Sequence, residues 1–232
     1  MSGTTTSTTV GSGSVLTLNW HGIGTPQRPF DPGEEATWVS TDHFQQVLDV
    51  LVDRPDVRIT FDDGNASDVE IALPRLVERG LTAQFFVLAG LLGRPGRLDA
   101  DGVRELARSG MAIGSHGWAH RDWRELRPDE VATELAEAPR LLADLVARPV
   151  TEVAIPFGSY DRRVLSRLRT AGVARAYTSD GGRARPDQWL QARNSLRAVT
   201  TAAQVRALLE HRPSRLTRAR RGAVMWVKRH RL

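Results

Sequence analysis

Residues 57–64 read Val-Arg-Ile-Thr-Phe-Asp-Asp-Gly, an apolar and β-branched run that ends in two carboxylates and a glycine. The composition of Val57–Phe61 predicts a strand, and the polar residues after it predict a tight turn. Successive side chains of a strand point to opposite sides, so Asp62 and Asp63 can reach different places. One can bind a metal ion while the other faces a substrate. The alternative is a turn that caps the next helix.

Short apolar runs followed by helical patterns continue on both sides of this stretch, over about residues 15–210. Alternating strands and helices build a parallel sheet covered by helices, and seven strands without a break halfway favour a barrel. The predicted strands are Val15–Trp20, Val57–Phe61, Thr82–Leu88, Met111–Ile113, Thr151–Ile155, Val173–Thr178 and one within Leu190–Val199. The predicted helices are Thr41–Val52 with Thr41 as N-cap, Asp68–Arg79, Asp99–Ser109, Pro128–Ala147, Arg162–Ala171 and Thr201–Leu209.

A second polar strand end reads Ser-His-Gly-Trp-Ala-His and spans residues 115–120. The spacing of His116 and His120 puts both imidazoles on one face of a helical turn, where they suit one metal ion. A pair of surface histidines is the alternative. Together with Asp63 they form a set of three protein ligands, which is typical of a catalytic metal site with open positions.

Two further strand ends carry candidate residues. Residues 154–161 read Ala-Ile-Pro-Phe-Gly-Ser-Tyr-Asp, in which Pro and Gly predict a fixed loop and Phe157 and Tyr160 could wall a pocket. A purely structural loop is the alternative. At the end of the first strand, His21 follows Trp20, and an imidazole satisfied by local hydrogen bonds is the alternative to a catalytic one.

Together these segments resemble the polysaccharide deacetylase family, the NodB-homology domain of metal-dependent carbohydrate esterases. The Thr-Phe-Asp-Asp-Gly at 60–64 and the Ser-His-x-x-x-His at 115–120, about 50 residues apart, match its first two motifs in type, order and spacing. The stretch 155–161 is similar to the third motif of a common subgroup. The resemblance covers about residues 15–210 and implies an α/β fold, a distorted barrel of seven βα units of the NodB-homology type.

The resemblance also implies roles at the metal centre. Asp62 is implied as the general base. The implied ligands of a divalent metal ion are Asp63, His116 and His120. Zn²⁺ is the expected ion, with Co²⁺ or Ni²⁺ as alternatives.

Two roles depart from the family's common pattern. A circularly permuted subgroup begins with a strand that ends in an aromatic-His pair; Trp20-His21 matches it, so His21 is the expected catalytic acid. His211, near the C-terminus, is the alternative. Many members carry an Arg in the third motif that orients the catalytic Asp, but Ile155-Pro156 stands there. Arg193 matches an Arg of the permuted members and is expected to substitute.

The implied reaction is hydrolysis of the N-acetyl group of an amino sugar to acetate and a free amine. The sugar can belong to a polysaccharide or be lipid- or nucleotide-linked, and the alternative is a non-catalytic carbohydrate-binding module on a decayed scaffold. A backbone N–H of residues 156–160 is expected to hold the oxyanion. The expected substrate-binding residues are Pro156, Phe157, Gly158, Tyr160 and Arg193, and Trp20 and Trp118 are further candidates for stacking on a sugar ring.

Charge is unevenly distributed along the 232 residues. Lys and Arg number 32 and Asp and Glu 27, which gives a net charge of +5. Residues 212–232 hold eight of the basic residues and no acid, so residues 1–211 carry 5 − 8 = −3. The basic character therefore belongs to the C-terminal segment, and no nucleic-acid partner is expected. The absence of cysteine excludes disulfides, thiolate zinc sites and cysteine nucleophiles.

These patterns predict three parts: a disordered Thr/Ser/Gly-rich leader over 1–14, a domain over 15–211 and a basic tail over 212–232. The leader lacks the regions of a secretory signal, and no run reaches the roughly 18 apolar residues of a membrane span. We therefore expect a cytoplasmic location. The tail combines its basic residues with Val224, Trp226 and Val227. It is expected either to touch an anionic membrane at its inner face or to form a solvated or domain-covering helix.

Overall fold

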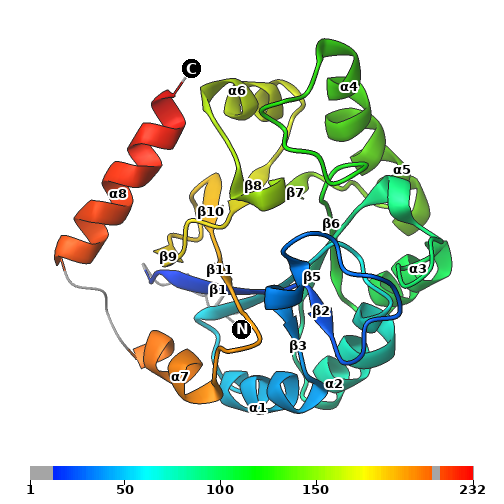
Figure 1. Cartoon of the computed structure of the whole chain (residues 1–232), viewed down its shortest axis with the longest axis vertical. Coiled ribbons are helices and arrows are strands. Elements are labelled where there is room, and N and C mark those ends of the chain that lie inside the picture. The colour runs from blue at the N-terminus through cyan, green and yellow to red at the C-terminus, as the bar shows by residue number, and fades with distance from the viewer. Residues whose placement is uncertain (1–12, 211–214, 232) are drawn as a thin grey trace, which may run out of the picture.

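The computed structural model describes residues 13–210 and 215–231, so most of the predicted leader and the alternative acid His211 lie outside the described residues. The predicted strands all form, and together they make one nearly closed sheet with helices around it (Figure 1). Neighbouring strands along the order β10-β8-β7-β6-β5-β4-β1-β11 are parallel. Their bounds are β1 Val15–Trp20, β4 Val57–Asp62, β5 Gln84–Val87, β6 Ala112–Ser115, β7 Glu152–Ala154, β8 Arg175–Thr178, β10 Leu190–Ala192 and β11 Asn194–Ser195.

Three short strands were not predicted from the sequence. β2 (Gly22–Ile23) and β3 (Trp38–Val39) pair with each other outside the main sheet, and β9 (Arg183–Ala184) runs antiparallel to β1. Two-residue strands contain too few side chains to produce a period-2 pattern. The segment between β2 and β3 is therefore a loop that local sequence signals did not delimit.

The barrel closes through the segment 190–195. β10 pairs with β8, and β11 pairs with β1 at the opposite end of the strand order. Arg193 is the single residue between the two short strands. The last predicted strand is thus two strands, which join the two edges of the sheet.

The helices occupy the predicted stretches. Their bounds are α1 Thr41–Leu51, α2 Leu73–Glu78, α3 Ala100–Arg108, α4 Pro128–Ala132, α5 Ala138–Val146, α6 Arg162–Thr170, α7 Ala202–Glu210 and α8 Arg215–His230. The 3₁₀ turns are η1 Glu34–Thr37, η3 Ala89–Leu91 and η5 Pro156–Gly158, and the π-helical turns are η2 Asp68–Ala72 and η4 Thr133–Glu137. The prediction of Thr41 as an N-cap is wrong, because the Ser40 hydroxyl accepts the hydrogen bond from the His43 amide and Thr41 is already helical.

Each π-helical turn precedes a proline inside a helical stretch. η2 ends two residues before Pro74, and η4 ends two residues before Pro139. Proline lacks the amide N–H and its ring clashes with the carbonyl four residues earlier. The wider π turn moves that carbonyl away, so the helical stretch continues past the proline.

Alternation along β4 separates the core from the site. Phe61 stacks on Trp20 of β1 and on Phe85 of β5, with ring centroids 5.7 and 4.6 Å apart, and Phe44 of α1 packs edge-on against Phe61. These rings fill the layer between sheet and helix. Thr60 and Asp62 therefore point the other way, into the barrel.

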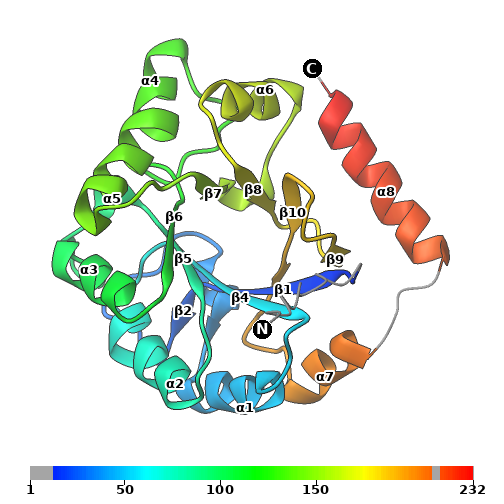
Figure 2. The same cartoon turned by 180° about the vertical axis from the view of Figure 1, so that it is seen from behind.

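Among the helices in the described part of the chain, none is long and apolar enough to span a membrane. The C-terminal helix α8 lies along one edge of the molecule beside α6 (Figures 1 and 2).

Candidate metal centre and catalytic site

The two carboxylates at the end of β4 diverge as expected. Asp62 is the last residue of the strand, and Asp63 follows with a φ of 78°. Gly64 also has a positive φ, 64°, so the chain turns sharply after the strand. Both carboxylates are buried, with 3% and 5% of the residue exposed.

The two histidines converge on Asp63 by a route that differs from the prediction. Residues 116–120 are not helical, and both Gly117 (φ 87°) and His120 (φ 55°) have left-handed backbone. The prediction of a helical turn is therefore wrong, although the outcome for the two imidazoles is the same. A Cβ at position 117 would lie 2.3 Å from Glu134, so this position requires glycine.

Glu134, a residue that the sequence did not single out, holds this loop. Its buried carboxylate accepts hydrogen bonds from the backbone amides of Trp118 (2.8 Å) and Ala119 (3.1 Å) and from the indole of Trp123 (3.3 Å). It lies on the π-helical turn η4. Its role follows from its burial and its contacts in the structure, and no local sequence pattern indicated it.

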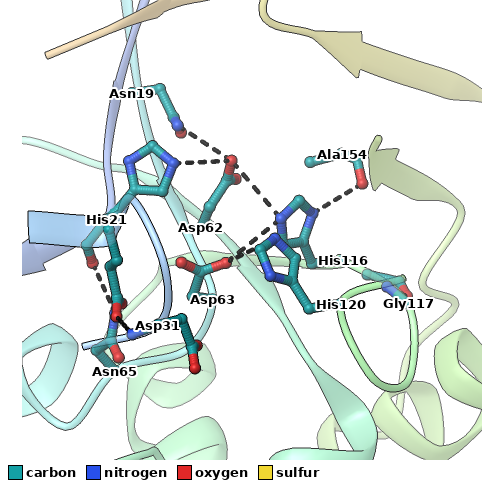
Figure 3. A network of polar contacts seen from close by, with 12 residues as sticks. Asn19, His21, Asp31, Asp62, Asp63, Asn65, His116, Gly117, His120 and Ala154 are labelled. Atoms are coloured by element: carbon teal, nitrogen blue, oxygen red, sulfur yellow. Dashed lines mark hydrogen bonds and ion pairs between the residues drawn. The ribbon is translucent and has the colours of Figure 1, made fainter. Parts of the chain in front are cut away.

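Asp63, His116 and His120 present one ligand atom each within 4.8 Å of one another (Figure 3). Asp63 Oδ1 lies 3.4 Å from Nε2 of His116 and 3.6 Å from Nε2 of His120. His116 Nδ1 lies 2.8 Å from the Ala154 carbonyl, a contact that requires the proton on Nδ1 and leaves the Nε2 lone pair facing Asp63. Two imidazoles and one carboxylate therefore converge on one point, as the protein ligands of a metal site do.

The electrostatics of the cluster fit a cation. Asp63 Oδ1 is buried and has no hydrogen-bond donor among the described residues, an arrangement that is costly unless a cation fills it. Burial lowers the pKa of His116 to about 4, so its imidazole is neutral and able to act as a ligand at neutral pH. The donor set and the orphaned oxygen both fit a divalent metal ion.

Arg193 forms a bidentate ion pair with Asp62. Its two terminal nitrogens lie 2.6 and 2.7 Å from the two carboxylate oxygens, and Asn19 donates a further hydrogen bond of 3.1 Å. Burial alone would raise the pKa of Asp62, but the charge of Arg193 and the neighbouring His116 hold it well below its usual range. Arg193 thus contacts the acid that it was expected to orient. Because it is only 1% exposed and lies behind Asp62, its assignment to substrate binding is wrong.

His21 lies on the opposite side of Asp62 from His116 (Figure 3). Its Nε2 is 4.0 Å from Asp62 Oδ2, and it is not one of the three clustered ligand residues. The Asn65 side chain donates to its backbone carbonyl, at 3.1 Å. The structure therefore brings His21 to the site without making it a metal ligand.

Residues 42–176, more than half of the chain, match the family model described as polysaccharide deacetylase. The chain belongs to the polysaccharide deacetylase family.

Two curated relatives match this chain over about half of their own length. YxkH of Bacillus subtilis (strain 168), named as a candidate polysaccharide deacetylase, is 28% identical over 141 residues, which are 61% of this chain and 50% of YxkH. The chitooligosaccharide deacetylase of Rhizobium leguminosarum bv. trifolii is 27% identical over 122 residues, 52% of this chain and 55% of that one. The chain therefore spans about half the length of the curated relatives it matches.

The fold recurs in solved structures. The Streptococcus pyogenes deacetylase PplD, solved in complex with acetate, has a TM-score of 0.74 at 20% identity over 87% of this chain and 100% of that one. The match confirms the predicted barrel of the NodB-homology type.

A cavity of about 840 Å³ opens over the metal centre of this deacetylase-family chain. His21, the two carboxylates and both clustered histidines line one side. The β2–β3 segment and the loop after β5 line another side, with Arg28, Asp31, Glu34, Arg94 and Arg97. This wall was not predicted from the sequence; the Pro29 and Pro32-Gly33 turn signals after the first strand were the available indication.

Among the predicted stacking residues, Phe157 lines the cavity. It is 64% exposed, and its ring centroid lies 4.4 Å from that of His120. The prediction is wrong for Trp20, which is fully buried between Phe44 and Phe61. It is also wrong for Tyr160, which is 2% exposed and donates its hydroxyl to Asp180.

The remaining predicted substrate-binding residues do not line the cavity. Pro156 and Gly158 are buried, and the partly buried Trp118 packs against the core. Their assignment to substrate binding stays a prediction. Gly158 (φ 60°) would bring a Cβ within 2.8 Å of Ser179, so Pro156 and Gly158 fix the loop that presents Phe157.

Proposed function

We propose that this chain is a metal-dependent hydrolase that removes the N-acetyl group of an amino sugar, giving acetate and a free amine. The observation that carries the proposal is the convergence of Asp63, His116 and His120 beside Asp62 at the floor of a cavity large enough for a sugar. Membership of the polysaccharide deacetylase family supports it.

The expected metal is Zn²⁺, held by Asp63, His116 and His120. Two neutral imidazoles and one carboxylate are a frequent ligand set of catalytic zinc, and Co²⁺ or Ni²⁺ accept the same nitrogen ligands. The bound ion would act as a Lewis acid on the acetyl carbonyl and make water easier to deprotonate.

Two side chains of the protein, Asp62 and His21, carry out the proton transfers. Asp62 accepts the proton of the attacking water, and Arg193 holds its carboxylate in one orientation. His21 donates a proton to the leaving nitrogen, which must depart as a neutral amine. Its place at the end of β1, next to β4, brings it to the cavity from outside the metal cluster.

The oxyanion is held by a backbone donor of the loop after β7. Pro156 has no N–H, and the amides of Gly158 and Ser159 donate to Ile155 and Pro156 within the loop. The amides of Phe157 and Tyr160 remain. Tyr160 is only 2% exposed, whereas Phe157 is exposed with its ring beside His120, so the Phe157 amide is the donor we assign to this role.

An acetylated amino-sugar oligomer is the substrate we favour. The exposed Phe157 ring offers a flat apolar face beside the centre, as sugar rings require. The name of the rhizobial relative assigns it chitooligosaccharides. Lipid- and nucleotide-linked amino sugars are the other members of the substrate panel.

The test is a metal titration with two readouts. Protein stripped with a chelator is reloaded with Zn²⁺, Co²⁺ or Ni²⁺, and bound metal is measured beside acetate and amine release from the panel. We expect turnover to follow metal occupancy, and Asp63→Ala and His116→Ala to lose both, while His230→Ala on α8 keeps both. Stoichiometric metal in both site variants would disprove the ligand assignment. Sugar binding by the loaded protein without any acetate release would instead favour a carbohydrate-binding module.

A further inference from the structure

The helices α6 and α8 form one acid-free surface at an edge of the molecule. The C-terminal end of α8 reaches α6 (Figures 1 and 2), where the Arg162 amide donates to the carbonyl of Arg231, at 3.2 Å. The α6 sequence contains four arginines and no acid, and residues 215–231 contain seven basic residues and no acid. We call the exposed sides of these two helices the α6–α8 face.

The positive charges of the α6–α8 face are not neutralised by the protein. Its exposed arginines form no ion pair with any described acid; they are Arg162, Arg163, Arg169, Arg220, Arg229 and Arg231. Some arginines of other helices are paired: Arg104 on α3 pairs with Asp101 at 2.8 Å, and Arg140 on α5 pairs with Asp144 at 3.5 Å. Arg108 on α3 and Arg206 on α7 are exposed and form no ion pair with a described acid either. What distinguishes the α6–α8 face is that neither of its helices contains an acid.

Helix α8 is attached to the barrel through Lys228, which leaves Trp226 on the other side of the helix. Lys228 donates to the buried Asp180 at 2.6 Å and lies 5.2 Å from the centre of the Tyr160 ring. Trp226, two residues earlier, projects from nearly the opposite side of the helix. Trp226 is 61% exposed, Val227 is 57% exposed about a quarter turn away, and Val224, on the Lys228 side of the helix, is 52% exposed.

We propose that the α6–α8 face binds the surface of an anionic phospholipid bilayer. Unpaired arginines around an exposed Trp are attracted to anionic headgroups, while the Trp ring and the aliphatic groups enter the boundary with the acyl chains. The two valines favour a bilayer over a nucleic acid, because the phosphate backbone offers them no apolar contact. Lys228 also approaches the Gly158 carbonyl (3.4 Å), so the face adjoins the loop that carries Phe157.

The test measures binding of the full chain to phosphatidylcholine vesicles with and without phosphatidylglycerol, by co-sedimentation at low and high salt. We expect binding to the anionic vesicles alone, weakened by salt. Arg162→Gln with Arg220→Gln removes two charges from the face and should weaken binding by about fivefold per charge. Trp226→Ser should also weaken it. Arg104→Gln with Arg140→Gln removes the same net charge on the other side of the molecule and should bind like the unaltered chain.

No substituted side chain is in the barrel core, and circular dichroism of each variant checks the fold. Vesicle binding is measured without catalysis, so the test of this proposal does not depend on the deacetylase assignment. Failure of the unaltered chain to bind anionic vesicles would overturn the proposal. Equal loss in both double variants would reduce it to an effect of total charge. Binding of duplex RNA or DNA in place of vesicles, lost in Arg162→Gln with Arg220→Gln, would assign the face to nucleic acid.

Discussion

Arg193 holds both oxygens of Asp62, so the proposed base is oriented before any substrate arrives. The Asn19 side chain adds a third donor, and its own oxygen accepts from Arg193 and from Thr60, at 2.8 Å each. A carboxylate held in this way does not need to reorganise when it meets a water molecule. Geometry, more than intrinsic basicity, is what these contacts contribute.

We predict that Asp62→Asn keeps the bound metal but loses turnover by roughly 10²–10⁴-fold, because an amide cannot accept the water proton. Turnover and metal content are measured on the same preparation. The amide NH₂ would face a guanidinium N–H in a buried site, which costs about 1–3 kcal/mol, so the thermal unfolding temperature is recorded as well. A folded, metal-loaded variant with near-normal turnover would remove Asp62 from the mechanism.

His21→Ala should keep the metal and the fold but lose most hydrolysis of acetamides. The same variant should hydrolyse an activated acetyl ester much better than the amide, because a good leaving group needs little proton donation. The ratio of ester to amide turnover is the measurement. An equal loss on both substrates would show that His21 does not act as the acid.

At the scale of elements, the loop 116–120 is shaped by a partner far away in the sequence. Glu134 accepts two of its backbone amides, and left-handed residues at both Gly117 and His120 let the chain bring two imidazoles together without a helix. The metal centre therefore depends on η4 as well as on the strand ends.

We predict that Glu134→Ala weakens Zn²⁺ affinity by about 10–100-fold, the usual effect of removing a group that orients metal ligands. Chelator competition measures the dissociation constant. Glu137→Ala, on the exposed side of the same π turn, is the matched control and should bind Zn²⁺ normally. Unchanged affinity in Glu134→Ala would mean that the loop holds its shape by itself.

The alternating strands and helices of the barrel were predictable from sequence patterns, and the conformations of the irregular loops were not. The strands ending at Trp20 and Asp62 were predictable because their β-branched, aliphatic and aromatic residues favour strands. The site residues were predictable because they stand at the ends of these strands. The conformation of residues 116–120 was not, because it depends on a contact with Glu134. The burial of Tyr160 was not predictable either, since its partner Asp180 comes from another loop.

At the scale of the molecule, Lys228 is the main polar link between the described side chains of α8 and the barrel. Asp180 accepts from Lys228, from the Tyr160 hydroxyl (2.7 Å) and from Thr178 (2.8 Å). Lys228 also approaches the Gly158 carbonyl (3.4 Å), and α8 contacts α6. The barrel has its own core, to which α8 contributes no fully buried apolar side chain among those described.

Lys228→Met should therefore release α8 without unfolding the barrel. We expect amide hydrogen exchange over residues 215–230 to become faster, with the thermal unfolding of the barrel nearly unchanged. Arg220→Gln, an exposed position on the same helix, is the control. Unchanged protection of α8 in Lys228→Met would show that contacts other than the Asp180 ion pair fix the helix.

The position of Arg193 between β10 and β11 couples catalysis to the integrity of the whole sheet. The residue that fixes Asp62 is held in place by pairing with β8 on one side and β1 on the other. Any opening at this edge, whether by local fraying or incomplete folding, also withdraws the guanidinium from the base. Partly folded molecules would then be unable to carry out the proposed deacetylation even with the metal ligands assembled, and specific activity would report the fraction of chains whose barrel has closed.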